Sequence, residues 1–177
     1  MTAPAPEPLD AEALRRLAEA HSPELTRYVS GVLGGDHESA RDIVQEAFVR
    51  LWRKPPADDS NLRAWLYSLC RSRAIDVLRR RGRMVSDDGF LVESTEDESP
   101  SPARSLAEAE AARDLFALVD TLPGRARELV KLKFREDLSY AEIAAVTGLS
   151  VSNVGFILHG AIKTLRERIV ARTEFRP

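Results

Sequence analysis

The stretch "LSYAEIAAVTGLSVSNV", residues 138–154, decides the fold of the second half of this chain. Ser139 followed three residues later by Glu142 is the signature of a capping box at a helix N-terminus. Gly148 then predicts a tight turn, and Ser150 is suited to cap the helix that follows. Two capped helices joined by a short glycine turn are typical of a DNA-binding helix-turn-helix, although helical hairpins without a DNA function share the pattern.

A helical wheel divides the second of these helices into two faces. The apolar face is predicted to pack in the core and carries Val151, Val154, Leu158, Ala161, Ile162, Leu165 and Ile169. The other face carries Ser152, Asn153, Phe156, Ile157, His159, Gly160, Lys163 and Arg166. Because the N-terminal residues of a recognition helix reach base edges, Ser152 and Asn153 are candidates for hydrogen bonds there. His159, Lys163 and Arg166 are candidates for phosphate contacts.

Two apolar residues on the polar face, Phe156 and Ile157, do not fit this scheme. Three roles stay open for them: contact with thymine methyl groups, a surface that binds a protein partner, or packing beneath the C-terminal tail.

Composition predicts an all-α protein. The chain has 177 residues, of which 44% are apolar, and Leu, Ala, Arg and Glu dominate without alternating β-branched runs. Its single cysteine, Cys70, excludes an internal disulfide and a multi-cysteine zinc site, and is expected to be a small buried residue in a reducing compartment. No segment has the roughly 20 apolar residues that a membrane span needs. A cytoplasmic protein without membrane insertion is expected.

Helix start and stop signals divide the chain into two small helical domains and a linker. Residues 9–83 are expected to form a four-helix domain, with one helix after Asp10, a second restarting at Ser22 and Pro23, a third over 37–54 and a fourth over 61–81. Residues 84–104, rich in acids, Ser and Pro, predict a flexible acidic linker. Residues 105–177 are expected to form the helix-turn-helix domain.

The fourth predicted helix is strongly basic. The stretch "NLRAWLYSLCRSRAIDVLRRRGR", residues 61–83, holds seven arginines against one acid, Asp76. The arginines alternate with Trp65, Tyr67 and Ser72, and arginines neutralise phosphates while aromatic rings stack on unpaired bases. This helix is therefore a candidate for holding a DNA strand that is being opened, with a merely solvated basic helix end as the alternative.

The third predicted helix presents an acidic face. On "ESARDIVQEAFVRLWRK", residues 38–54, the apolar residues Ile43, Val44, Ala47, Phe48, Leu51 and Trp52 are expected to face the core. The opposite arc holds Asp42, Gln45, Glu46, Val49 and Arg53. An apolar residue ringed by charges is typical of a protein-docking surface, although most polar arcs are simply solvated.

Taken together, "ARDIVQEAFVRLW", "LRAWLYSLCRSRAIDVLRRR" and "LPGRARELVKLKFREDLSYAEIAAVTGLSVSNV" resemble successive segments of the extracytoplasmic-function class of bacterial sigma factors. The resemblance covers nearly all of the chain after the first ten residues. It implies a protein that binds core RNA polymerase and directs promoter-specific transcription initiation. No cofactor and no metal are expected, because the sequence has no metal-ligand cluster.

The resemblance assigns a role to each group of residues. It implies that Asp42, Gln45, Glu46 and Val49 dock on the β′ clamp helices of polymerase. Contact with and melting of the minus-ten element are implied for Arg63, Trp65, Tyr67, Arg71, Ser72, Arg73, Arg79 and Arg80. Reading of the minus-thirty-five element, near the β flap, is implied for Ser152, Asn153, Phe156, His159, Lys163 and Arg166.

Two places depart from the pattern of this class. Ser72 stands where members often have Asn, which affects recognition of a flipped base. In the recognition helix, where members often carry Lys and Arg, this chain has Gly155, Phe156, Ile157, Gly160 and Ile162. Fewer phosphate contacts and a weaker or differently shaped minus-thirty-five contribution are expected.

Two other functions remain as alternatives. A stand-alone helix-turn-helix regulator would leave the acidic arc and the basic helix without a role. A sigma mimic that sequesters an anti-sigma protein would not need the seven arginines of residues 61–83 to hold DNA. An anti-sigma protein is a candidate partner whether the chain is a sigma factor or a mimic. An enzyme is not expected, because His21, His37 and His159 are scattered and no phosphate loop or nucleophile–base pattern is present.

Overall fold

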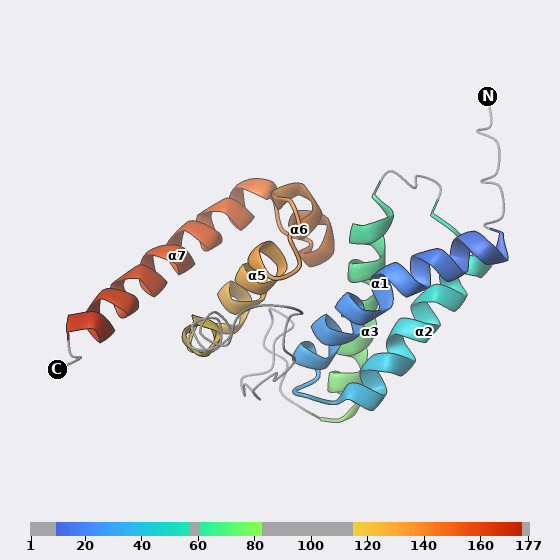
Figure 1. Ribbon diagram of the computed structural model, residues 1–177, viewed down its shortest axis with the longest axis horizontal. Coiled ribbons are helices and arrows are strands. Elements are labelled where there is room, and N and C mark those ends of the chain that lie inside the picture. The colour runs from blue at the N-terminus through green and yellow to red at the C-terminus, as the bar shows by residue number, and fades with distance from the viewer. Residues whose placement is uncertain (1–9, 57–60, 83–114, 175–177) are drawn as a thin grey trace. The chain divides into compact units, whose positions relative to one another are not determined.

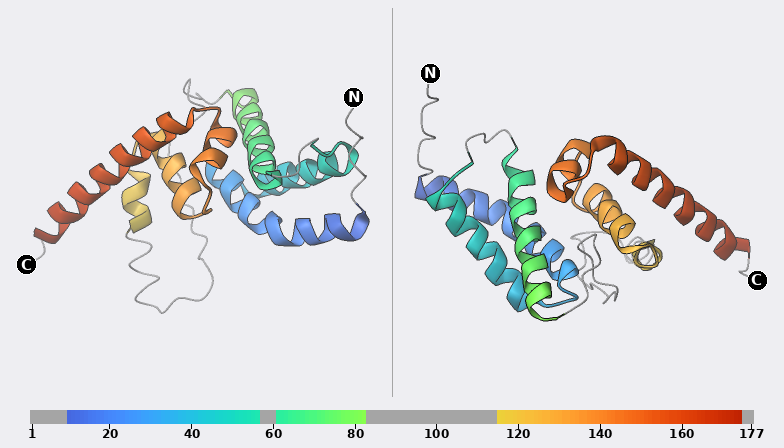
Figure 2. Two further views of the ribbon diagram at one scale, coloured as in Figure 1. Left: turned by 90° about the horizontal axis from the view of Figure 1, so that it is seen from above. Right: turned by 180° about the vertical axis from the view of Figure 1, so that it is seen from behind.

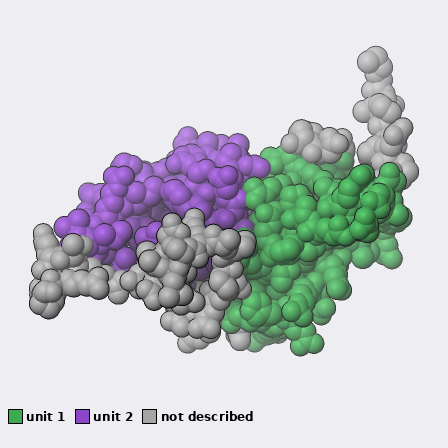
Figure 3. All heavy atoms as spheres, in the orientation of Figure 1, with its two compact units in different colours: residues 1–97 green, residues 98–177 purple. Residues whose placement is uncertain are grey.

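The computed structural model describes residues 10–56, 61–82 and 115–174, with side chains to residue 171. Within these ranges all regular structure is helical, which confirms the all-α prediction (Figure 1). The chain divides into two compact units, residues 1–97 and 98–177, coloured separately in Figure 3. The predicted linker, residues 84–104, lies outside the described residues, so its limits stay a prediction.

Three helices make up the described part of the first unit. They are α1 (Ala11–Val32), α2 (His37–Arg53) and α3 (Leu62–Arg80). Each helix contacts the other two, and α1 and α2 lie side by side in opposite directions (Figures 1 and 2). Fully buried leucines from all three helices form the core, including Leu25, Leu51, Leu66 and Leu78.

The expected break at Ser22 and Pro23 is wrong, and the first unit has one long helix where two were predicted. Pro23 lies inside α1. It is exposed, on the side of the helix opposite the stripe that contains Leu14, Leu25 and Val32. Because proline has no backbone N–H, the carbonyl four residues earlier lacks its usual helical donor, but on this exposed side it can bond water instead. Burial of one continuous apolar stripe then outweighs the cost of the proline.

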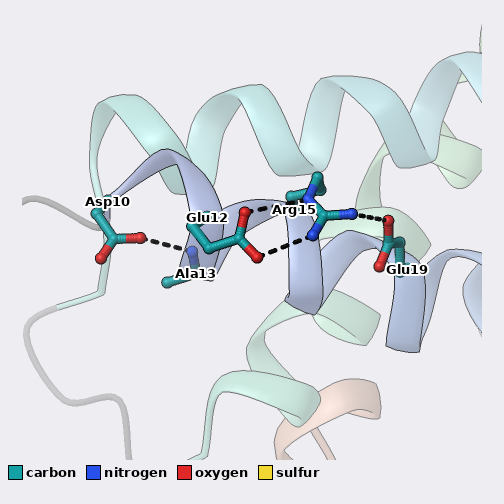
Figure 4. Close-up of polar contacts among 5 residues, drawn as sticks. All are labelled: Asp10, Glu12, Ala13, Arg15 and Glu19. Atoms are coloured by element: carbon teal, nitrogen blue, oxygen red, sulfur yellow. Dashed lines mark hydrogen bonds and ion pairs between the residues drawn. The ribbon is translucent and has the colours of Figure 1, made fainter.

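Local side-chain bonds fix the N-terminus of α1 (Figure 4). Asp10 is the N-cap, and its carboxylate accepts a hydrogen bond from the backbone N–H of Ala13 at 2.6 Å. One turn later the Arg15 guanidinium donates to Glu12 and to Glu19. All three charged side chains are exposed, so this network contributes little to stability beyond supporting the first turns.

The second unit contains a short helical segment over residues 115–120, then α5 (Gly124–Phe134), α6 (Tyr140–Thr147) and α7 (Val151–Glu174). Helices α5, α6 and α7 contact one another, and α7 is a single long helix (Figure 1). The core is again built of fully buried apolar side chains, among them Leu129, Leu132, Leu138, Ile143 and Leu158.

Among the described helices, no single one is both long and apolar enough to cross a membrane. One pair of helices, α6 and residues Val151–Ala171, is long and apolar enough when taken together, but the two are bent by 105° relative to each other.

Candidate nucleic-acid and protein interfaces

The α2 arc comprises Asp42, Gln45, Glu46 and Val49, all of which are exposed as the sequence predicted. Val49 is 48% exposed and lies directly opposite the buried side of α2. A helix with its core side filled presents this arc to solvent as a rigid surface. An apolar side chain among polar neighbours can there be covered by a partner protein.

Trp52, three residues after Val49, was expected in the core and is instead 44% exposed. It lies at the edge of the apolar stripe of α2, in the last turn of the helix. Trp52 and Val49 are neighbours on the helix surface, because residues three apart share a face. This aromatic residue next to the α2 arc was not predicted from the sequence, although its i+3 spacing from Val49 was a readable signal.

The N-terminus of α2 is held by Asp36. Its carboxylate accepts a hydrogen bond from the backbone N–H of Ser39 at 3.0 Å and pairs with the Arg81 guanidinium at 2.7 Å. The bonds from Ser39, followed by the Arg81 pair, lower the pKa of Asp36 to about 2. Since Arg81 immediately follows α3, Asp36 ties the start of α2 to the end of α3.

A second link between these helices involves the arc itself. The Glu46 carboxylate pairs with the Arg73 guanidinium of α3 at 2.8 Å. Both side chains remain partly exposed, so the pair is weak and can exchange partners at little cost. A predicted docking residue and a predicted DNA-contacting residue thus lie within hydrogen-bonding distance of each other.

Arg63 and Tyr67 are not on the exposed basic edge where the sequence placed them. The Tyr67 ring is fully buried and packs on Tyr28, with ring centroids 5.1 Å apart. Arg63 donates two hydrogen bonds to Glu24 of α1, at 3.2 and 3.0 Å, and lies over the Tyr67 ring. Interhelical packing holds both residues, so base stacking by Tyr67 is ruled out in this conformation.

Glu24 connects α1 to α3. Burial raises the pKa of the Glu24 carboxyl, but hydrogen bonds from Arg63 and His21 outweigh burial and leave the pKa below its usual value. His21 Nδ1 lies 2.7 Å from Glu24 Oε1. This half-buried cluster positions the N-terminal part of α3 rather than presenting charge to a ligand.

The exposed side of α3, here called the α3 face, consists of Trp65, Ser72, Arg79 and Arg80. Trp65, Ser72 and Arg79 are spaced by seven residues, about two helical turns, and so share one side of the helix. Ser72, Arg79 and Arg80 are exposed and Trp65 is partly exposed. A partly exposed ring near one end of a helix and exposed guanidinium groups at its other end form a suitable surface along which a DNA strand with unpaired bases can lie.

The remaining predicted residues of α3 lie at its flanks. Arg71 and Arg73 are partly buried, and Arg73 pairs with Glu46 as described. Cys70 is fully buried, which confirms its predicted role as a core residue. Burial, and to a lesser extent the charge of Glu46, raises the pKa of the Cys70 thiol to about 12, so the thiol is unreactive in the folded protein.

The helix-turn-helix forms as the sequence predicted. The Ser139 hydroxyl accepts from the Glu142 backbone N–H at 3.2 Å, while the Glu142 carboxylate accepts from the Ser139 N–H at 2.7 Å. Gly148 ends α6 with φ of 73°, and the Ser150 hydroxyl accepts from the Asn153 N–H at 3.2 Å. The 105° bend between α6 and α7 lies within the 90–120° range of DNA-binding motifs.

The exposed side of α7, here called the α7 face, carries every predicted DNA-contacting residue of the second unit. Its members are Ser152, Asn153, Phe156, His159, Lys163 and Arg166, all exposed. The buried side holds Val154, Leu158, Ala161 and Leu165. Val151 and Ile169, expected in the core, are 50% and 41% exposed because they lie at the edge of the buried stripe of α7.

Within the described ranges there is no group of three or more His, Cys, Asp or Glu side chains that could hold a metal ion.

The comparisons with known proteins agree with this arrangement. Residues 17–84 match the family described as Sigma-70 region 2, and residues 112–165 match the family described as Sigma-70, region 4. The first match contains the α2 arc and the α3 face. The second contains the helix-turn-helix and most of the α7 face.

Among curated proteins, this chain is 32% identical over 164 residues to the ECF RNA polymerase sigma factor SigL of Mycobacterium tuberculosis, covering 89% of each chain. It is 30% identical over 156 residues to the ECF RNA polymerase sigma factor SigE of Mycolicibacterium smegmatis, covering 85% of this chain. The matched region spans only 59% of the length of SigE.

Among solved structures, the chain is similar to the sigma factor RpoE of Bartonella quintana, crystallised in complex with the anti-sigma factor NepR. The TM-score is 0.66, with 27% sequence identity over 89% of this chain and 96% of that one. Two sigma-70 regions in order, together with a SigL relative matched along nearly its whole length, show that this chain belongs to the extracytoplasmic-function group of RNA polymerase sigma factors.

Proposed function

We propose that this protein binds core RNA polymerase and directs promoter-specific transcription initiation. The observation that carries the proposal is the presence of an exposed acidic arc, an exposed basic face and a helix-turn-helix, in the order of sigma regions 2 and 4. The protein acts in the cytoplasm by binding rather than by catalysis. Promoter binding energy favours the open state of the DNA, and RNA synthesis belongs to polymerase.

The α2 arc is the proposed contact with the β′ clamp helices. Asp42, Gln45 and Glu46 surround Val49 with polar groups, and Trp52 extends the apolar centre. An apolar centre with a polar rim is the usual composition of a protein–protein interface. Because Glu46 pairs with Arg73, polymerase that engages Glu46 would release Arg73 for DNA.

The α3 face is the proposed contact with the minus-ten element. Trp65 stacks on an unpaired base, Ser72 hydrogen-bonds a base edge, and Arg79 and Arg80 bind phosphates. Arg71 and Arg73 supply additional positive charge at the flanks of this face. Arg63 and Tyr67, named with these residues in the sequence analysis, are assigned a positioning role instead.

The α7 face is the proposed contact with the minus-thirty-five element, near the β flap. Ser152 and Asn153 lie in the first turn of α7, next to the N-terminus that enters the major groove in this motif. His159, Lys163 and Arg166 lie further along the helix and are placed to contact phosphates.

An anti-sigma protein is a further proposed partner. The similar sigma factor RpoE was solved in complex with an anti-sigma factor. Exposed apolar side chains on the second unit, such as Phe134 and Leu115, offer surface that such a protein would cover.

The docking proposal is tested by placing positive charge on the α2 arc while leaving the Glu46–Arg73 pair intact. The double variant Asp42→Arg with Gln45→Arg is expected to lose binding to purified core polymerase by at least ten-fold. Both residues are exposed, so the variant should unfold at the same urea concentration as the parent chain. Glu19→Arg, a charge reversal on the exposed side of α1, is the matched control and should bind normally.

Unchanged binding of the double variant would remove the docking assignment. If the parent chain does not bind core polymerase but binds duplex DNA specifically, a stand-alone regulator is the better account. If the parent chain binds neither core polymerase nor duplex DNA but does bind an anti-sigma protein, a sigma mimic is the better account.

The DNA assignment of α3 has its own test. Arg79→Ala combined with Arg80→Ala is expected to reduce open-complex formation while core binding is retained, because both side chains project from the exposed end of α3. Equal losses in the two assays would instead indicate a folding defect.

A further inference from the structure

Phe156 is the most exposed large apolar side chain in the described part of the chain, at 80%. On the helical wheel it lies directly opposite the buried side of α7, between Ser152 one turn before and Gly160 one turn after. Exposing a phenylalanine ring to this extent forgoes the free energy of its burial, which is roughly 1.5–3 kcal/mol. A ring in this position is suited to be covered by a binding partner.

The residues around Phe156 leave its ring accessible. A Cβ built at Gly160 would meet no atom within 4 Å, so the surface one turn beyond the ring is open. Gly155, the preceding residue, lies under the ring of Tyr140, whose Cε2 would be 3.6 Å from a Cβ at that position. Gly155 is covered by Tyr140, whereas Gly160 leaves the helix surface thin one turn beyond Phe156, which allows close approach of a large ligand on that side.

Charge indicates that this ligand is DNA rather than protein. Lys163 lies seven residues after Phe156 and therefore on the same side of α7, while His159 and Arg166 lie on the adjacent strip of the exposed surface. In a major groove the base edges are flanked by phosphates. The apolar ring lies near the helix end that would face the base edges, and the cations further along the same helix would face the phosphates. The 105° bend of the helix-turn-helix presents this side of α7 in the manner of a recognition helix.

We propose that Phe156 reads a thymine in the minus-thirty-five element by covering its C5-methyl group. Thymine is the one base that offers an apolar group in the major groove, and phenylalanine is among the residues that contact it. The assignment rests on the proposed function and adds a specificity-determining residue to it. It also accounts for how a helix with few cations gains affinity at this site.

The test uses holoenzyme assembled from the full chain and purified core polymerase. Promoter duplexes are first selected by that holoenzyme from a library with a randomised upstream element. Each thymine of the selected element, on either strand, is then replaced singly by deoxyuridine, which lacks only the methyl group. Promoter binding is measured for the parent chain, for Phe156→Ala, and for Val170→Ala, a matched control that truncates another exposed apolar side chain of α7.

The proposal predicts that deoxyuridine at one position weakens binding by the parent holoenzyme about three- to five-fold, the value expected for burial of one methyl group. Phe156→Ala should weaken binding to the thymine promoter at least as much and should lose sensitivity to deoxyuridine at that position. Val170→Ala should behave as the parent chain. Because Phe156 is so exposed, Phe156→Ala is expected to fold normally, which circular dichroism checks.

Several results would overturn the proposal. They are equal binding to thymine and deoxyuridine at every position, retained deoxyuridine sensitivity in Phe156→Ala, or a selected element made only of G·C pairs. An equal loss of core binding by Phe156→Ala would show that the ring contacts protein. Failure of the parent chain to bind core polymerase, measured separately, would overturn the proposed function and this inference with it.

Discussion

Replacing Asp36 by Ala should destabilise the first unit, because Asp36 both caps α2 and pairs with Arg81 at the end of α3. Loss of an N-cap costs about 1 kcal/mol, and loss of a partly exposed ion pair costs up to about 1 kcal/mol more. The lowering of the Asp36 pKa from 3.8 to about 2 corresponds to an upper limit of roughly 2.4 kcal/mol. Since the side chain is 30% exposed, solvent screening reduces this, and we expect about 1.5 kcal/mol.

The assay is urea unfolding followed by tryptophan fluorescence. Both tryptophans of the chain, Trp52 and Trp65, belong to the first unit, so their emission reports on that unit alone. With a urea dependence of about 1 kcal/mol per M, the unfolding midpoint of Asp36→Ala should fall by about 1.5 M at pH 7. Asp36→Asn keeps an oxygen that can accept from Ser39 and should lose about a third as much, roughly 0.5 kcal/mol.

The effect depends on pH with a defined sign. The folded-state pKa of Asp36 is depressed, so its charge stabilises the folded protein above the unfolded-state pKa of 3.8, and this contribution is lost as the pH falls toward about 2. The difference between the parent chain and Asp36→Ala should therefore shrink between pH 4 and pH 2. If Asp36→Ala unfolds at the parental urea concentration at pH 7, the capping and ion-pair account of this junction is refuted.

Three further outcomes are expected. Gly160→Ala should stabilise the second unit by roughly 0.5–1 kcal/mol in thermal melts followed by circular dichroism, because a Cβ there meets nothing and alanine favours helix; an unchanged or lower melting temperature would contradict this. The Cys70 thiol, with its pKa raised to about 12 by burial, should react with a thiol reagent at pH 8 only at the rate of unfolding, whereas rapid labelling of the folded chain would disprove burial. Glu24→Gln should lower stability by about 1–3 kcal/mol, measured by tryptophan fluorescence, since it removes the carboxylate that pairs with the half-buried Arg63 guanidinium. The loss should fade at pH values below the lowered pKa of Glu24, and a pH-independent difference would argue against the ion pair.

Local chemistry explains which parts of the fold could be predicted from the sequence. The capping box at Ser139, the turn at Gly148 and the cap at Ser150 are all bonds between residues within three or four positions of each other. Such bonds are readable from spacing alone. The helix-turn-helix and the exposure of the α7 face were therefore predicted correctly.

The errors share a tertiary cause. Pro23 was taken as a helix start, but packing of the stripe on the other side of α1 keeps the helix continuous. Tyr67 and Arg63 were placed on an exposed edge because their chemistry suits DNA, yet Tyr28 and Glu24 of α1 hold them inside the bundle. Which side of a helix a neighbour covers depends on residues far away in the sequence, and one sequence does not reveal that.

The most direct measurement of the central claim is run-off transcription with purified core polymerase on genomic fragments. The parent chain should yield specific transcripts, the Asp42→Arg and Gln45→Arg double variant should yield none, and the Glu19→Arg control should match the parent. Absence of specific transcripts from the parent chain, or full activity of the double variant, would contradict the division of roles between the α2 arc and the α3 face.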